Sequence, residues 1–468
     1  MFQKYNLMKF IFTILMTCLI QLSFAQIEQK TIKVDKRIRN FIVYKPKNFH
    51  VGMPLVINMH GFTMTGSNQM NYTVMNKKAD EAGFVVIYPS GLQKRWGSGT
   101  FFGVVNKVDD VNFTRMMIDY MQLYYGIDPS KVYSTGYSAG GFMSYRLACE
   151  IPGRIAAIAP VASSMIYEIY ESCNPEKRIP IMIVNGTTDP VVAYNGIPGN
   201  FPSVDKVVEL WSKESVCDPV IIPDTLPNIE VNDNSRVVKT WYPPCTDTKG
   251  VLFYKILYGG HTWPGSGPLA ILGNTNQDIK LNDEMWDFFN QYQIAIEDFC
   301  ALVENPSVNV SDCSATLTWN AVEGATSYRI VLHNLQTREF VSYTSSTPSL
   351  NLSLSEGSQY RWSVGVNCAS GSFRSTSGPD FSACTGINGR VGNLDEKFLL
   401  YPNPASNQIN VFVDEANDVP MARILDYSGK TIKEVSLYSG LNEINIEGLA
   451  GGMYILQTTQ GSQTFVKL

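Results

Sequence analysis

One serine of this chain lies in a spacing that suits nucleophilic chemistry. Residues 136–140 have the sequence Gly-Tyr-Ser-Ala-Gly, a G-x-S-x-G pattern with Ser138 at its centre. The residues before it predict a strand and those after it predict a helix. In a strand–turn–helix segment this spacing makes a sharp turn that exposes the serine. The pattern alone is weak, because an ordinary glycine-rich turn has the same composition, so the rest of the chain must supply partners.

A nucleophilic serine needs a base, and the chain has four histidines, His50, His60, His261 and His333. His333 belongs to a later region with a different sequence pattern, and His50 precedes the first central strand. His60 ends an apolar strand at residues 54–59, and we expect it to hydrogen-bond within its own loop. His261 lies in a Gly-Gly-His-Thr-Trp-Pro-Gly loop just beyond the apolar strand at residues 251–257. An imidazole there has a pKa suited to moving a proton to and from Ser138.

The base in turn needs a carboxylate that orients it. Of the acids between Ser138 and His261, Asp189 alone stands directly beyond a buried strand, at residues 179–184. The end of that strand is the carboxyl edge of the predicted sheet, so we expect Asp189 beside His261, where it would fix the imidazole tautomer. An Asp-Pro turn residue is the alternative. We expect Asp109 and Asp110 to cap a helix or brace a loop.

A tetrahedral oxyanion needs backbone donors. The amide of Ala139, at the start of the predicted helix, is one candidate. The loop after the early buried strand should supply the second, so the Phe62 amide is the first choice and the Thr63 amide the next.

The elements that position these residues are apolar strands alternating with helices. We expect strands at residues 41–44, 54–59, 84–88, 132–135, 155–160, 179–184 and 251–257, and helices at 110–125, 141–149 and 282–292. Such alternation predicts an open, mostly parallel α/β sheet covered on both faces. After residue 299 the pattern changes to short alternating strands separated by Ser, Thr and Asn turns, which is typical of all-β sandwiches.

The N-terminus predicts export. Lys4 and Lys9 precede an apolar run at residues 10–20, and small residues stand before a cleavage point after Ala25. We therefore expect a secretory signal peptide at residues 1–25, with a membrane anchor as the alternative. No other segment predicts a transmembrane span in the mature chain.

The net charge and the number of cysteines further limit the classes of protein to which the chain can belong. The net charge is −5, and basic runs are absent, which argues against nucleic acid as a partner. Eight of the nine cysteines follow residue 25, and an even number in an exported chain predicts disulfides, paired within two separate domains. No cysteine or histidine spacing predicts a metal site, and we expect no cofactor.

At this point residues 30–295 resemble a known family, the secreted esterases that include polyhydroxybutyrate depolymerases, feruloyl esterases and acetylxylan esterases. The matching motifs stand in order at residues 60–61, 88–91, 108–111, 125–129, 136–140, 145–150, 189–192 and 260–265. The resemblance implies an α/β-hydrolase, in which the order Ser138, Asp189, His261 is the usual one. It also implies a Cys217–Cys245 disulfide.

Two departures from the family pattern affect the substrate site. The family often has Cys after the His-Gly pair and Trp-Asn near residue 96, whereas this chain has Phe62 and Trp96-Gly97. Trp96 and Trp263 are candidates for stacking on a sugar or an aromatic acyl group, with simple packing as the alternative.

Two further resemblances concern the rest of the chain. Residues 300–384 resemble a fibronectin type III domain, and residues 395–468, with an opening Tyr-Pro-Asn-Pro and a late Gly-Met-Tyr strand, resemble the C-terminal sorting domain of the type IX secretion system of Bacteroidetes. That domain implies recognition by the outer-membrane translocon, followed by release or surface anchoring. We thus expect a signal peptide at 1–25, a catalytic domain at 26–297, a fibronectin-like domain at 298–386, a linker at 387–394 and a sorting domain at 395–468.

The resulting hypothesis is a secreted or surface-anchored serine esterase that acts on feruloyl or acetyl esters of plant xylan. An aliphatic or aromatic polyester is the alternative substrate. A serine peptidase of the same fold and a non-catalytic glycan-binding surface protein are the rival classes.

Overall fold

The computed structural model describes residues 26–101, 104–105, 108–173, 179–213, 223–243, 250–311, 313–383, 398–401, 407–413, 421–426, 429–437, 440–458 and 461–467. The predicted signal peptide and the predicted linker lie outside these residues. The chain divides into two compact units, Met1–Thr385 and Gly386–Leu468, which are described separately.

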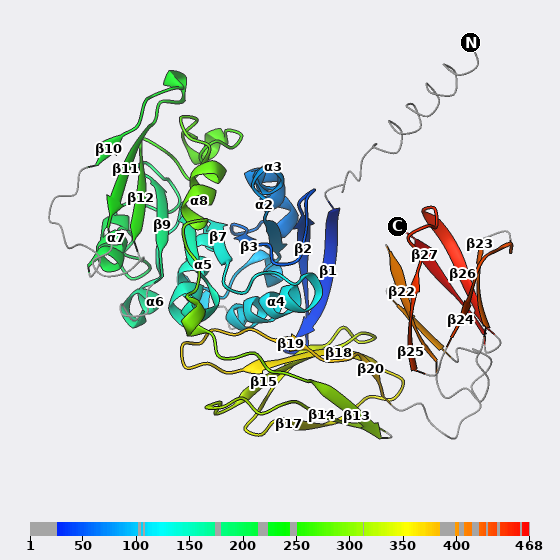
Figure 1. Cartoon of the computed structure of the whole chain (residues 1–468). Helices are drawn as coiled ribbons and strands as arrows, with labels where there is room; N and C mark the ends of the chain where they lie inside the picture. Colours follow the sequence, from blue (N-terminus) through cyan, green and yellow to red (C-terminus); the bar gives the residue numbers. More distant parts are fainter. Residues whose placement is uncertain are drawn as a thin grey trace, which may run out of the picture. The chain divides into compact units, whose positions relative to one another are not determined.

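A ten-stranded sheet forms the centre of the first unit, in the order β1-β2-β4-β3-β7-β8-β9-β12-β11-β10 (Figure 1). The six strands from β4 to β12 pair in parallel, and antiparallel strands flank them on both sides. The strands are β1 (Gln26–Val34), β2 (Arg37–Lys45), β3 (Leu55–Met59), β4 (Val85–Pro89), β7 (Val132–Tyr137), β8 (Ala157–Val161), β9 (Ile181–Gly186), β10 (Asp224–Thr225), β11 (Arg236–Tyr242) and β12 (Val251–Leu257). A separate short hairpin pairs β5 (Thr100–Phe101) with β6 (Val104–Val105).

Helices cover both faces of this sheet. They are α2 (Gly66–Thr73), α3 (Met75–Ala82), α4 (Asp110–Tyr125), α5 (Ala139–Glu150), α6 (Tyr167–Ser172), α7 (Val204–Ser212) and α8 (Leu281–Phe289), with 3-10 turns η1 (Leu92–Lys94), η2 (Pro152–Arg154), η4 (Val231–Asp233), η5 (Ala270–Leu272) and η6 (Ile296–Asp298). One buried apolar cluster joins alternate strand residues to α4, α5 and α7, and a second joins the other residues to α3 and α8. Successive strand residues point to opposite faces, so the core has two layers, and the fully buried strands account for their apolar runs. The predicted α/β-hydrolase fold is confirmed.

The predicted elements agree closely with the observed ones in places. The helix expected at residues 110–125 is α4 with the same bounds, and the strand expected at 251–257 is β12. Helices α2, α3, α6 and α7 were not predicted. We call residues 26–298, which build the sheet and its helices, the α/β domain.

Residues 300–383, which we call the first sandwich, are entirely antiparallel. The two sheets have the orders β13-β14-β17 and β16-β15-β18-β19, with β20 also paired to β18. Their strands are β13 (Ser307–Ser311), β14 (Ser314–Thr318), β15 (Tyr328–Asn334), β16 (Phe340–Ser345), β17 (Ser349–Ser353), β18 (Gln359–Val366), β19 (Thr376–Ser377) and β20 (Phe381–Ser382). The buried Trp362 lies in its core, and the Tyr360 hydroxyl accepts a hydrogen bond from the Ser355 amide. This is a tyrosine-corner contact, as in immunoglobulin-like sandwiches, while the fibronectin type III assignment stays a prediction.

The first sandwich packs directly on the α/β domain. Val331 and Phe340 of β15 and β16 belong to the same buried apolar cluster as helix α4. The Asp119 carboxylate of α4 accepts hydrogen bonds from Arg154, at 2.7 Å, and from Arg329 of β15, at 2.8 Å. A buried apolar contact joined to a buried ion network fixes the two parts of this unit together.

The second unit is also antiparallel, as predicted for a second all-β domain. Its sheets have the orders β21-β22-β25 and β24-β23-β26-β27, built from β21 (Phe398–Tyr401), β22 (Gln408–Val413), β23 (Met421–Asp426), β24 (Thr431–Ser436), β25 (Gly440–Asn445), β26 (Gly452–Thr458) and β27 (Gly461–Lys467). An apolar cluster that includes Ile409, Ile424 and Phe465 fills the space between them. Within the described part of the chain, none of the helices has the length and apolar character needed to span a bilayer.

Candidate active site

Ser138 lies at the sharp turn between strand β7 and helix α5. Its backbone has φ 54° and ψ −119°, a strained region for a residue with a side chain, and its amide donates a hydrogen bond to the Val161 carbonyl, at 2.9 Å. The strained backbone is typical of a nucleophile elbow, which holds the serine hydroxyl at the carboxyl edge of the sheet.

The two glycines of the motif are explained by close backbone contacts. A Cβ on Gly136 would stand 2.4 Å from the carbonyl carbon of Gly140, and a Cβ on Gly140 would stand 2.2 Å from the Met59 carbonyl oxygen. Any side chain at either position would therefore push the elbow away from β3 and α5. The two glycines are therefore required for close backbone packing, as well as for the conformational freedom of the turn.

His261 is held by its backbone above this elbow. Its amide donates to the Leu272 carbonyl at 2.7 Å, and its own carbonyl accepts from the Tyr137 hydroxyl at 2.7 Å. The Tyr137 ring also lies 4.9 Å from the imidazole, centre to centre. The loop that follows β12 is thus fixed on two sides, and the imidazole has a defined position.

The structure brings the three predicted residues into one hydrogen-bonded chain. Nε2 of His261 lies 2.9 Å from Oγ of Ser138, and Nδ1 lies 2.7 Å from Oδ2 of Asp189. Because a carboxylate oxygen only accepts, the ring hydrogen lies on Nδ1, and the Nε2 lone pair faces the serine hydroxyl. All three side chains are more than nine-tenths buried.

Asp189 is positioned by the turn that follows β9. Its second oxygen, Oδ1, accepts hydrogen bonds from the amides of Val191, at 2.7 Å, and Val192, at 2.8 Å. With one oxygen committed to these amides, the other is left for His261. The carboxylate is therefore fully hydrogen-bonded although it is buried, as a buried charge must be.

The two amides predicted as oxyanion donors are both uncommitted among the described residues. Those of Phe62 and Ala139 make no hydrogen bond with a described residue, whereas the Thr63 amide donates to the Lys94 carbonyl at 3.1 Å. Ala139 is the first residue of α5, where an amide has no partner within the helix. Of the two candidates in the loop after β3, Phe62 is the one with a free amide.

His60 holds that loop in shape. Its Nδ1–H donates to the Gly61 carbonyl at 2.7 Å, its Nε2 accepts from the Gly91 amide at 2.9 Å, and its carbonyl accepts from the Trp96 indole at 2.8 Å. Burial lowers the pKa of His60 to about 4, so the ring is neutral at pH 7. As expected from the sequence, this histidine hydrogen-bonds within its own loop.

The acids at the start of α4 act as a cap and a brace. Asp109 is the N-cap and accepts from the Asn112 amide. Asp110 is fully buried, pairs with Arg39 at 2.5 Å and accepts from the Gly97 amide at 2.6 Å. Burial raises the pKa of Asp110, with Arg39 acting in the opposite direction. Both roles are those that the sequence predicts.

The two tryptophans predicted as substrate contacts are almost fully packed. Trp96 is 4% exposed and Trp263 is 1% exposed. The Trp263 backbone amide donates to the Tyr72 hydroxyl at 2.9 Å, beside Tyr137. Their contact with a substrate stays a prediction.

The predicted Cys217–Cys245 disulfide is not described, because Cys217 and Cys245 lie outside the described residues. The described disulfide of the α/β domain joins Cys149 to Cys173.

Two residues near the site were not predicted. Tyr137, the second residue of the G-x-S-x-G motif, supports the His261 loop, and Tyr72 packs against it at 5.2 Å between ring centres. Tyr137 could have been noticed from its place beside the serine. Tyr72 lies on α2 and gives no such signal.

No set of three or more possible metal ligands clusters in the described part of the chain.

Comparison with known proteins finds similar sequences for two parts of the chain. Residues 399–468 match the family model of the secretion system C-terminal sorting domain. The chain is 28% identical over 269 residues to a bifunctional acetylxylan esterase/xylanase of Neocallimastix patriciarum, covering 57% of this chain and 36% of that protein. It is 34% identical over 192 residues to feruloyl esterase B of Piromyces equi, covering 38% and 36%.

A third relative has a different kind of substrate in its name. Over 123 residues the chain is 31% identical to poly(3-hydroxyalkanoate) depolymerase C of Paucimonas lemoignei, covering 25% of this chain and 29% of that protein. The chain thus spans about a third of the length of these three relatives. The α/β domain is similar in sequence to esterases and to a depolymerase. Residues 399–468 form a type IX sorting domain, which places the chain among secreted or cell-surface proteins.

Proposed function

We propose that this chain is a secreted serine hydrolase that cleaves carboxylic esters. The observation that carries the proposal is the continuous hydrogen-bonded chain from Asp189 through His261 to Ser138. That arrangement activates a hydroxyl, because the imidazole can take its proton while the carboxylate stabilises the imidazolium that forms.

The reaction has two halves. Ser138 Oγ attacks the ester carbonyl while His261 Nε2 takes the hydroxyl proton, and the tetrahedral oxyanion lies between the amides of Phe62 and Ala139. His261 then gives the proton to the leaving alcohol, and an acyl-enzyme remains. Water attacks the acyl group by the same route, which releases the acid and restores Ser138. The occupied Thr63 amide supports Phe62 as the donor.

For the substrate we propose a feruloyl or acetyl ester of a plant polysaccharide such as xylan. The names of two relatives support this class. Phe62 carries the proposed oxyanion donor, and the Val191 amide donates to Asp189. Their side chains are 55% and 47% exposed, which offers an apolar surface for an acyl group. Type IX secretion machinery is the proposed partner of the C-terminal domain.

A polyester is the second candidate substrate, and the named depolymerase relative favours it. One panel of methyl ferulate, acetylated xylan and polyhydroxybutyrate separates the two. Ferulate or acetate release at least tenfold faster than polyester hydrolysis supports the first proposal, and the reverse order supports the second.

The activity itself is tested with the variant Ser138→Ala. We expect it to lose about three to six orders of magnitude in kcat on an aryl acetate and to lose labelling by a fluorophosphonate probe. Ser172→Ala, which changes a surface serine of the same domain, is the matched control and should keep both. Near-normal turnover by Ser138→Ala would reject the triad. Absence of labelling and of turnover in the unchanged protein would favour the non-catalytic glycan-binding alternative, and cleavage of peptides in place of esters would favour a peptidase.

A further inference from the structure

A cleft lies where the first sandwich meets the α/β domain, away from Ser138. It has a volume of about 330 Å³. One wall consists of the end of α5 with η2, together with Arg115 of α4, and the other is the loop at residues 367–373 of the first sandwich. Neither domain forms the cleft alone.

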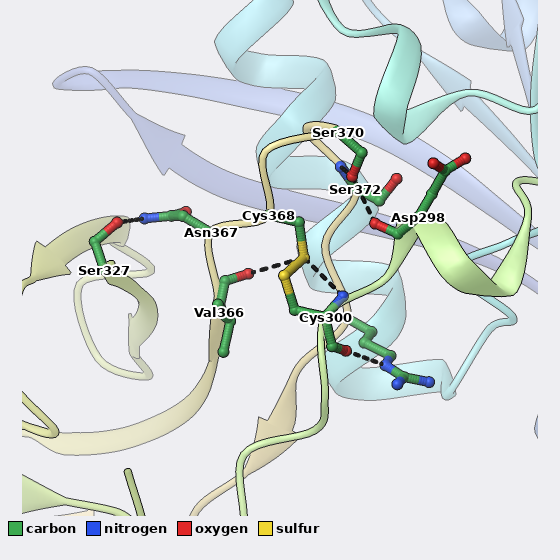
Figure 2. The surroundings of a disulfide bond; sticks show 9 residues. Asp298, Cys300, Ser327, Val366, Asn367, Cys368, Ser370 and Ser372 are labelled. Carbon is green, nitrogen blue, oxygen red and sulfur yellow. Dashed lines mark hydrogen bonds between the residues drawn. A yellow bond between two sulfur atoms is a disulfide. The ribbon is translucent and has the colours of Figure 1, made fainter. Parts of the chain in front are cut away.

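Disulfides fix both walls. Cys149, in the first wall, is bonded to Cys173, and Cys368, in the second, is bonded to Cys300. Figure 2 shows the second wall, where the Ser370 hydroxyl donates to the Asp298 carbonyl and accepts from the Ser372 amide. The cleft is therefore preformed, which lowers the entropic cost of holding a ligand.

Three arginines line the cleft, and they differ in their partners. Arg154 and Arg329 share the Asp119 carboxylate. Arg115 also lines the cleft, and it makes no ion pair within 4.0 Å with a described residue. Burial and the charge of Arg329 lower the pKa of Arg115, and the nearby acids act in the opposite direction.

The surrounding charges leave one cation in excess. The acids near Arg115 are Asp109, Asp119 and Glu150. Glu150 is bonded to Arg146, outside the cleft, at 2.6 Å. Four arginines thus face three carboxylates. Arg115 makes no ion pair with a described residue, although the charges of Asp119, Asp109 and Glu150 act on it.

Two further polar atoms, on residues that line the cleft, lack partners among the described residues. They are Nε of Arg329 and the hydroxyl oxygen of Ser372, and both are buried. Ser372 is only 1% exposed. A buried donor without an acceptor costs about 1–3 kcal/mol, so such groups call for an explanation, and a bound acceptor is one.

We propose that this cleft binds the carboxylate of a small polyhydroxylated acid, of the size of one uronic-acid residue. A carboxylate only accepts hydrogen bonds, and guanidinium groups match its two oxygens. Arg115 and Arg329 supply the charge, and the Ser372 hydroxyl and the Asn367 amide supply neutral polar contacts for hydroxyl groups. The volume lies at the small end of ligand pockets, as a single sugar requires.

The cleft is separate from the ester site. Helix α5 begins next to Ser138 and ends at the cleft, and its 12 residues span about 18 Å. If the proposed function is right, the acid is a unit of the polysaccharide distinct from the one that carries the ester. Such a second contact raises the effective affinity for an acidic polymer without taking part in the chemistry.

The test is calorimetric titration of the full chain with glucuronate, with glucose as the uncharged match. We expect glucuronate to bind with millimolar or better affinity and glucose to give no signal. Arg115→Gln should weaken glucuronate binding at least tenfold. Arg236→Gln, which changes an exposed arginine of β11, is the matched control and should bind as the unchanged chain does. Ser372→Ala removes a hydroxyl without a partner, so it should keep the thermal unfolding temperature and still weaken binding several-fold.

Other outcomes overturn the proposal. Equal binding of glucose would reject recognition of the carboxylate, and equal binding of acetate would reject recognition of the hydroxyl groups. Binding of sulfate alone would leave only an inorganic anion site. No binding of glucuronate, or binding that Arg115→Gln and Ser372→Ala both leave unchanged, would reject the cleft. None of these probes is an ester, so the result is independent of whether Ser138 is catalytic.

Discussion

Gly140 lies so close to the backbone of Met59 that no side chain fits at position 140. A Cβ on Gly140 would stand 2.2 Å from the Met59 carbonyl oxygen, which is backbone and cannot rotate away. Met59 ends β3, and the next residues form the loop that carries the Phe62 amide. The same contact therefore sets the distance between the nucleophile and the proposed oxyanion donor.

Gly140→Ala should consequently separate these two groups. We expect a loss of about 3 kcal/mol in the free energy of unfolding, and a fall of about 100-fold in kcat from a displacement near 1 Å. Denaturant unfolding and aryl acetate hydrolysis measure the two effects. Gly267→Ala is the control, because a Cβ there meets nothing within 4 Å. Equal stability and turnover of the two variants would contradict this account of the motif.

Asp189→Asn should disable His261 while leaving its place intact. The Asn Oδ1 would still accept from the amides of Val191 and Val192, so the NH₂ group would face Nδ1 of His261. That arrangement puts the ring hydrogen on Nε2, where it can no longer take the Ser138 proton. We expect kcat to fall by about three to four orders of magnitude, with little change in thermal unfolding. Asp224→Asn on the exposed strand β10 is the control, and a comparable loss there would show a non-specific effect.

Much of the site follows from the sequence because its residues stand at the ends of strands. Parallel strands bring their carboxyl ends to one edge of a sheet, so the positions of Ser138, Asp189 and His261 just beyond β7, β9 and β12 predict their proximity. The buried strands are apolar runs, and helix α4 has a strong cap at Asp109. These signals are local, and they need no knowledge of the tertiary contacts.

Other parts depend on contacts that local patterns do not carry. Helices α2 and α3 are short and mostly polar, and they are separated by Val74 in the left-handed conformation, so their apolar periodicity is weak. The Asp119–Arg329 ion pair joins residues 210 positions apart. Nothing in the composition of either segment specifies that pairing, and the same holds for the cleft beside it.

Trp96→Phe distinguishes packing from substrate contact. The change keeps a ring but leaves the His60 carbonyl without its donor, which should cost about 1–3 kcal/mol in stability. If the ring only packs, KM for methyl ferulate stays unchanged and kcat falls as the loop shifts. A several-fold rise in KM at constant kcat would instead support the predicted stacking on substrate. Trp241→Phe, at a ring that is 41% exposed, is the control and should alter neither.

His333 makes the contact between the two domains of the first unit sensitive to acid. Its Nδ1 is hydrogen-bonded to the Tyr124 hydroxyl of α4, and Arg361, which pairs with Asp380, lies over the Tyr124 ring. Burial and the charge of Arg361 lower the pKa of His333 to about 4. In the unfolded chain the pKa is about 6.5. Between these values the unfolded chain binds more protons, so the free energy of unfolding must fall as the pH decreases from 6.5 to 4.

The variant His333→Gln isolates this effect. The full loss attributable to His333 is about 3 kcal/mol, and below pH 4 it should level off. In His333→Gln the pH dependence of unfolding between 6.5 and 4 should be shallower by that amount, although His60, which has a similarly lowered pKa, leaves a slope of its own. His50→Gln, at an exposed histidine, should retain the full slope of the unchanged chain. Parallel curves for His333→Gln and His50→Gln would show that the pKa of His333 is the same in the folded and the unfolded chain, and that the contact between the domains does not respond to acid through this residue.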